Sequence, residues 1–110
     1  MTLLGTGFAY DPGQRARQAA VLAQVLPSVR DVRRIGSCAL DLCMVAAGRL
    51  DAYYEVGVQV WDWAAAALIA AEAGATVWLP TAPGAEYVAA SAPAIADALH
   101  DALAGAGMDL

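Results

Sequence analysis

Two carboxylates flank a single strand-to-helix connection in this chain. Glu55 follows Tyr53 and Tyr54 at the end of an apolar run typical of a strand, and Asp62 stands in the first turn of an alanine-rich stretch with high helix propensity. Gly57 permits a turn between them. In open α/β sheets, ligands bind in the crevice outside the carboxyl ends of the strands. We therefore expect both carboxylates to line a ligand site.

Each carboxylate also has a simpler interpretation. An acidic residue in the first turn of a helix is favoured by the helix macrodipole whatever the protein does. Trp61 and Trp63 flank Asp62, however, so we expect its carboxylate to be partly desolvated and to need a partner, of which a metal cation is one. Glu55 is either a solvated residue at a strand end, the commoner position of a Glu, or a polar group of the pocket.

The turn at Gly36 and Ser37 is a third candidate part of the site. The simplest interpretation is a tight turn followed by a helix N-cap. A helix amino terminus also has free N–H groups that bind an anion or a hydroxyl, so both interpretations stay open. Arg33 and Arg34 are interpreted as a solvated pair at a strand end, with a smaller chance that one reaches a partner subunit.

Two further features do not predict chemistry. Gly5-Thr6-Gly7 lacks the rest of a phosphate-binding glycine motif, so it is interpreted as a turn or at most as a wall of a metal site. His100, the only histidine, falls in a terminal helical stretch without a credible nucleophile nearby, and is interpreted as structural or surface.

Glycine and proline divide the chain into short apolar runs and longer helical stretches, a pattern typical of βαβ units. The predicted strands are 2–10, 32–35, 52–56, 76–79 and 87–91, and the predicted helices are 14–26, 38–47, 62–73 and 93–104. A turn over 80–86 joins the last two strands. The order β-α-β-α-β-α-β-β-α predicts an α/β fold with a five-stranded, mostly parallel (mixed) sheet and flanking helices. The order of strands within the sheet does not follow from the sequence.

Composition restricts the partners of the chain. Its 110 residues predict a single domain, 1–110, and 60% of them are hydrophobic against a usual share of about 45–50%. Such a chain buries unusually much or expects a partner surface. The net charge of −5 opposes binding to nucleic acid and to anionic lipid. The apolar window 63–71 is shorter than the ~20 residues of a membrane span, and is interpreted as a buried core helix.

The cysteines and the amino terminus favour a cytoplasmic protein. Cys38 and Cys43 lie about 140° apart around a predicted helix, so they face away from each other and are interpreted as reduced thiols. Their spacing fits no zinc pattern. The first residues lack the basic region and cleavage pattern of a signal peptide.

Four spaced motifs run through the chain in order: Thr6-Gly7-Phe8-Ala9-Tyr10, Arg34-Ile35-Gly36-Ser37-Cys38-Ala39, Gly48-x-x-Asp51-Ala52-Tyr53-Tyr54-Glu55 and Trp61-Asp62-x-Ala64-Ala65-x-x-Leu68-Ile69-x-x-Glu72-Ala73-Gly74. Together they resemble the carboxyl-terminal half of the inositol monophosphatase family, over about residues 2–91. Several motifs in the right order are more specific than any one of them.

The resemblance implies one half of a layered α/β/α/β/α fold and a Mg²⁺-dependent phosphatase that hydrolyses inositol monophosphate or a similar polyol or sugar phosphate. In the complete enzyme, Asp62 would be a ligand of Mg²⁺ and contact the substrate, and Glu55 would accept a hydrogen bond from a substrate hydroxyl. Gly36, Ser37 and Cys38 would form the substrate-binding wall of the pocket. The Tyr-Tyr-Glu strand favours an inositol-phosphate type of pocket within the superfamily.

The motifs that the family uses to bind most of its metal are not in this sequence. The Glu-Glu run and the Asp-Pro-x-Asp-Gly-Thr segment belong to the amino-terminal half of the family, so we expect this chain alone to be inactive. Ala9, Ala66 and Ala75 replace commonly Pro or Gly positions, which bears on turn shape and packing. The alternative is a non-catalytic binding or assembly module derived from the fold. Expected partners are a small phosphate ester and either a second copy of the chain or a complementary amino-terminal half.

Overall fold

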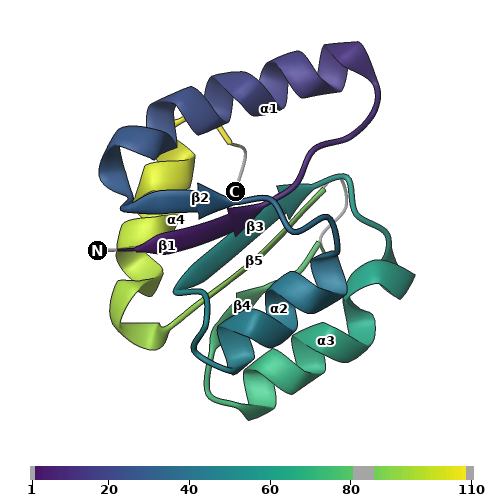
Figure 1. The fold of residues 1–110 in the computed structure, drawn as a ribbon, viewed down its shortest axis with the longest axis vertical. Coiled ribbons are helices and arrows are strands. Elements are labelled where there is room, and N and C mark those ends of the chain that lie inside the picture. Colours follow the sequence, from purple (N-terminus) through teal and green to yellow (C-terminus); the bar gives the residue numbers. More distant parts are fainter. Residues whose placement is uncertain (1, 81–85, 109–110) are drawn as a thin grey trace.

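The computed structural model describes residues 2–80 and 86–108, and in these ranges a mixed β-sheet lies between two pairs of helices (Figure 1). The strands are β1 (Leu3–Thr6), β2 (Asp31–Arg33), β3 (Ala52–Val56), β4 (Thr76–Trp78) and β5 (Tyr87–Ser91). The α-helices are α1 (Pro12–Val25), α2 (Cys38–Ala46), α3 (Val60–Glu72) and α4 (Ala96–Gly105). Short 3₁₀ turns follow α1 and precede α4, at Leu26–Ser28 and Pro93–Ile95.

The order of strands across the sheet is β2-β1-β3-β5-β4. β1 is parallel to both of its neighbours, and β5 is antiparallel to both β3 and β4. The predicted order of elements and the mixed sheet of five strands are therefore confirmed over the described residues. The predicted turn over 80–86 lies largely outside these residues.

The two faces of the sheet have separate cores because side chains alternate along each strand. Helices α2 and α3 pack over Tyr53, Val88 and Ala90 on one face. Helices α1 and α4 cover the other face, where Ala52 and Tyr54 lie. Glu55 is two residues beyond Tyr53, so it points to the α2–α3 side, at the end of β3.

The first strand is shorter than predicted. It ends at Thr6, because the backbone N–H of Ala9 donates to Gln18 Oε1 at 2.9 Å instead of continuing the ladder. Helix α1 also begins two residues earlier than predicted. The Asp11 carboxylate accepts a hydrogen bond from the Gln14 N–H at 2.9 Å, and Pro12 follows at the first helical position, where its missing N–H costs nothing.

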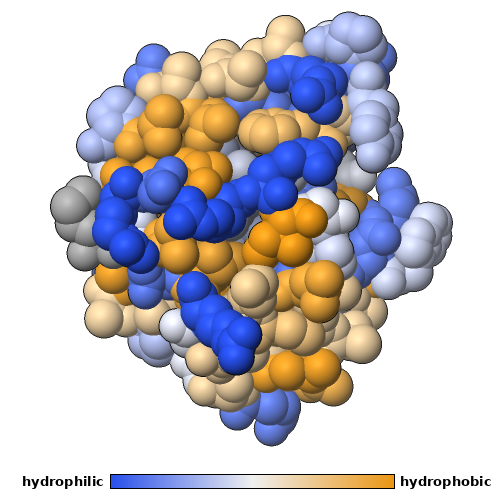
Figure 2. Space-filling view, viewed as in Figure 1, coloured by the Kyte–Doolittle hydropathy of each residue, from blue (hydrophilic) through white to orange (hydrophobic). Residues whose placement is uncertain are grey.

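Helix α3 is not the buried core helix that its composition predicted. Only its inner alanines are buried, whereas Leu68 is 62% exposed and Ile69 is 51% exposed. Leu40 of α2 and Val60 and Trp61 of α3 are also exposed, and we call these five exposed apolar side chains of α2 and α3 the apolar face. Figure 2 shows apolar residues gathered over the region of α2 and α3. Within the ranges that the structure describes, none of the helices is long and apolar enough to cross a membrane.

Candidate functional site

A pocket of about 380 Å³ opens where β1 and β3 end and α2 and α3 begin. Its lining contains every residue that the sequence put forward for the site: Gly36, Ser37, Cys38, Glu55 and Asp62. The remaining wall comes from Gly7, Phe8, Tyr10, Arg34, Ala39, Val58 and Trp61. The sheet topology explains why these residues lie in one pocket, because the carboxyl ends of the adjacent parallel strands β1 and β3 meet at one edge of the sheet.

The Glu55 carboxylate is held by a buried phenol. The Tyr53 hydroxyl donates to Glu55 Oε1 at 2.8 Å, and Tyr53 has no exposed surface. Partial burial raises the pKa of Glu55, and the hydrogen bond from Tyr53 and the charge of Arg34 oppose that rise. Sequence reasoning gave Tyr53 no direct role in the site. The sequence contains the signal for this contact, because residues two apart on a strand, such as Tyr53 and Glu55, point to the same face of the sheet.

Asp62 combines a structural and an accessible position. The Gln59 N–H donates to Asp62 Oδ2 at 2.8 Å, so one carboxylate oxygen stabilises the start of α3, the first turn in which the sequence places it. The partial desolvation expected for Asp62 agrees with its half-buried position, but Trp61 does not contribute to it. Trp61 is 79% exposed and Asp62 itself is half-buried, because consecutive helical residues point about 100° apart.

The wall formed by Gly36, Ser37 and Cys38 is a capped helix start. Gly36 has a φ of +91°, which favours glycine, and the Ser37 hydroxyl accepts a hydrogen bond from the Leu40 N–H at 3.2 Å. The predicted N-cap is therefore confirmed. Burial raises the pKa of the Cys38 thiol to about 11, so it is neutral at pH 7 and suits a wall better than a nucleophile. Cys38 and Cys43 are both free thiols, as expected.

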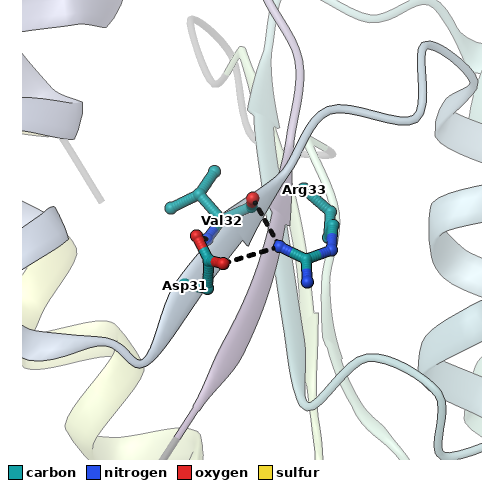
Figure 3. A network of polar contacts seen from close by, with 3 residues as sticks. All are labelled: Asp31, Val32 and Arg33. Atoms are coloured by element: carbon teal, nitrogen blue, oxygen red, sulfur yellow. Dashed lines mark hydrogen bonds and ion pairs between the residues drawn. The ribbon is translucent and has the colours of Figure 1, made fainter.

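Arg33 at the end of β2 and Arg34 directly after it are both exposed, as the interpretation of a solvated pair requires, but their side chains have different neighbours. Arg33 Nη1 lies 2.9 Å from an Asp31 carboxylate oxygen and 3.2 Å from the carbonyl oxygen of Val32, which it meets as a donor (Figure 3). Both side chains of this ion pair are more than half exposed, so it contributes little to stability. Arg34 instead lines the pocket, where its charge acts on Glu55.

The structure adds a buried acid that sequence reasoning did not single out. Asp41 of α2 has no exposed surface, and neither of its carboxylate oxygens has a hydrogen-bond partner among the described residues. Burial, and next the charge of Glu55, raises the pKa of Asp41 to about 7. Its position three residues after Cys38 and four before Val45, both buried, was the available signal.

The pocket fits part of a magnesium site. In the ranges described, no group of three or more His, Cys, Asp or Glu side chains is placed to hold a metal ion. Mg²⁺ is usually held by one or two carboxylates together with waters and substrate phosphates. Asp62, with one carboxylate oxygen engaged at the helix start, fits as one contributing ligand.

A sheet layered between helices, with a pocket at the carboxyl ends of parallel strands, defines an α/β protein with a candidate site where open α/β sheets bind ligands. More narrowly, the chain belongs to the inositol monophosphatase family, whose family model matches residues 1–107.

Individual relatives agree with this assignment. The chain is 71% identical over 107 residues to an inositol-1-monophosphatase of Mycobacterium leprae, covering 94% of this chain and 37% of that protein. The solved structure of Mycobacterium tuberculosis SuhB superposes with a TM-score of 0.88 at 65% identity, over 97% of this chain and 42% of the other. A protein named Nus factor SuhB from Pasteurella multocida is 49% identical over 77 residues, which are 69% of this chain and 29% of that protein. The chain thus spans well under half the length of these relatives.

Proposed function

We propose that this chain is the carboxyl-terminal part of a Mg²⁺-dependent phosphomonoesterase that hydrolyses inositol monophosphate or a similar polyol or sugar phosphate. The observation that carries the proposal is the convergence of Glu55 and Asp62 in one pocket at the carboxyl ends of β1 and β3. Its support is the family and the 71% identity to a relative named inositol-1-monophosphatase.

The two carboxylates would act on different parts of the substrate. Asp62 would hold Mg²⁺, which when bound supplies an activated water and stabilises charge on the leaving oxygen. Glu55 would accept a hydrogen bond from a polyol hydroxyl, since a carboxylate accepts hydroxyl protons well and repels phosphate. Arg34, Gly36, Ser37 and Cys38 would complete the wall against which the substrate lies.

The remaining catalytic groups would come from a complementary amino-terminal part. The described chain offers too few metal ligands by itself, and it spans 37% of the Mycobacterium leprae relative. A non-catalytic module is less well supported, because the pocket keeps both of its carboxylates in place. The net charge of −5 still argues against a nucleic-acid or membrane partner for this part. A cytoplasmic location remains a prediction.

Joining this chain behind the amino-terminal part of the Mycobacterium leprae relative tests the proposal. We expect phosphate release from inositol 1-phosphate with Mg²⁺ at a turnover near the enzyme median of about 10 per second. The 110-residue chain alone should release none above background, because its described residues place no group of three or more ligands for the metal ions. Phosphate release by the chain alone, or no phosphate release from polyol phosphates by the joined protein, would contradict the proposal.

The chain alone should also self-associate through the apolar face. Exposed apolar patches larger than those of ordinary monomers mark interaction sites. Light scattering of the chain at increasing concentration should therefore report dimers or larger species. Replacing Leu68 and Ile69 together by Lys should restore the monomer. The control is Leu26→Lys, which places a charge at a residue of similar exposure (49%) in the 3₁₀ turn after α1. A clean monomer at high concentration would show that the apolar face needs no partner.

A further inference from the structure

The Glu55 carboxylate is fixed on one side by the core of the protein. Its Oε1 accepts the hydrogen bond from the Tyr53 hydroxyl at 2.8 Å. Tyr53 is completely buried between the sheet and the α2–α3 layer, so its ring cannot follow a moving carboxylate. Burial also raises the pKa of Tyr53, so the phenol keeps its proton and remains a donor. One of the two Glu55 oxygens is therefore engaged before any ligand arrives.

The same carboxylate also lies against the backbone of Gly7. Thr6 pairs with Tyr54 in the parallel ladder, so Gly7 follows directly alongside Glu55. A Cβ placed on Gly7 would fall closest to Glu55 Oε1, the oxygen that accepts from Tyr53, and would lie 2.6 Å from Cδ and 2.9 Å from Oε2, closer than real Cβ atoms approach. The present position of the carboxylate thus requires a residue without a side chain at position 7.

We propose that Tyr53 and Gly7 are positioning residues that set the direction of the Glu55 carboxylate and thereby the selectivity of the pocket for the hydroxyl-bearing part of its substrate. The inference rests on the proposed function, in which Glu55 accepts a substrate hydroxyl. The hydrogen bond from Tyr53 orients the carboxylate, so the directions in which its remaining lone pairs, including both on Oε2, can accept a hydroxyl are set. An oriented acceptor discriminates between alcohols because an alcohol without a hydroxyl at that point leaves the partly buried carboxylate without that hydrogen bond.

The test compares two substrates in the joined enzyme described above. Inositol 1-phosphate carries hydroxyls beyond the phosphate ester, and ethyl phosphate carries none. Tyr53→Phe removes the donor, and Gly7→Ala pushes the carboxylate away from it. We expect each variant to lower the ratio of kcat/KM for inositol 1-phosphate to that for ethyl phosphate by about tenfold, mainly through a higher KM for the inositol ester.

Both variants should leave the fold intact. The clash in Gly7→Ala falls on the far end of the flexible Glu55 side chain, which can move, and Tyr53→Phe conserves the ring. A merely structural role would lower activity on both substrates alike, leaving the ratio unchanged. Tyr54→Phe is the matched control, because it removes the same hydroxyl from the next residue, which is also buried but on the opposite face of the sheet. We expect its ratio to equal that of the unmodified enzyme.

Glu55→Gln distinguishes a failure of the positioning inference from a failure of the proposed role of Glu55. A lowered ratio in Glu55→Gln, with Tyr53→Phe and Gly7→Ala unchanged, would overturn the positioning inference and leave the proposed role of Glu55 standing. An unchanged ratio in Glu55→Gln would overturn that role and the inference together. A lowered ratio in all three variants, with Tyr54→Phe unaffected, is the result we expect.

Discussion

Replacing Asp62 with Asn is expected to lower the Mg²⁺-dependent turnover of the joined enzyme by orders of magnitude while its fold survives. Asn has nearly the same size, and its side-chain oxygen can accept the Gln59 N–H as Asp62 Oδ2 does at 2.8 Å. The start of α3 is therefore preserved. The negative charge is lost, and a neutral amide is a poor substitute for a carboxylate that holds a divalent cation.

The measurement is turnover of inositol 1-phosphate over a range of Mg²⁺ concentrations, with thermal unfolding as the check on the fold. Asp97→Asn is a matched control, because Asp97 is also acidic in the first turn of a helix but lies on α4, on the other side of the sheet. It should change neither quantity substantially. Near-normal turnover of Asp62→Asn at limiting Mg²⁺ would show that Asp62 is only a helix cap.

The sequence predicted the elements best where a strand or helix is defined by its own residues. The limits of β3 and β5 were predicted to the residue, because alternation and flanking turns mark both strands. β1 was predicted too long, because only the ladder partners show that pairing stops at Thr6. The position of β5 between β3 and β4 depends on long-range pairing that no local pattern contains.

The candidate site was predicted in composition but not in detail. Glu55 and Asp62 were found because chemistry in α/β proteins gathers after strands, and the structure brings both to one pocket. The support behind them was missed. The contact between Gly7 and Glu55 joins residues 48 positions apart, and it becomes visible only when β1 and β3 are placed side by side.

Burial on helices was the weakest sequence inference. The apolar window 63–71 predicts a buried core helix, yet one side of α3 is exposed. Conversely, the acidic Asp41 is completely buried. A small apolar side chain is compatible with either environment, and one acidic residue in a short helix does not reveal which neighbours cover it.

The second large expected effect is a loss of stability with rising pH that depends on Asp41. Its carboxyl group has a pKa of about 7 in the folded chain, against an unfolded value of about 3.9. Folding therefore favours the protonated form. The folded state binds more protons than the unfolded state between about pH 4 and pH 7, so the free energy of unfolding falls as the pH rises through that window and is lowest above it.

The shift of about three pKa units corresponds to roughly 4 kcal/mol between the two ends of the window. Asp41→Asn keeps a polar side chain of similar size that does not titrate, so this part of the pH dependence should disappear. Glu55 contributes a slope of the same sign, because partial burial raises its pKa as well. The effect of Asp41 is therefore the difference between the two proteins, and above pH 7 the variant should be the more stable.

Urea unfolding of the chain and of Asp41→Asn at pH 5 and pH 8 measures that difference directly. Asp101→Asn, which removes an exposed carboxylate from α4, is the control and should keep the slope of the unmodified chain. Equal slopes for the chain and Asp41→Asn would mean that water reaches the carboxylate. The expected result would instead show that an unpaired buried acid destabilises the folded chain at neutral pH. Because the charges of Glu55 and Asp41 interact, ionisation of Asp41 would also change the electrostatic environment of Glu55 in the pocket.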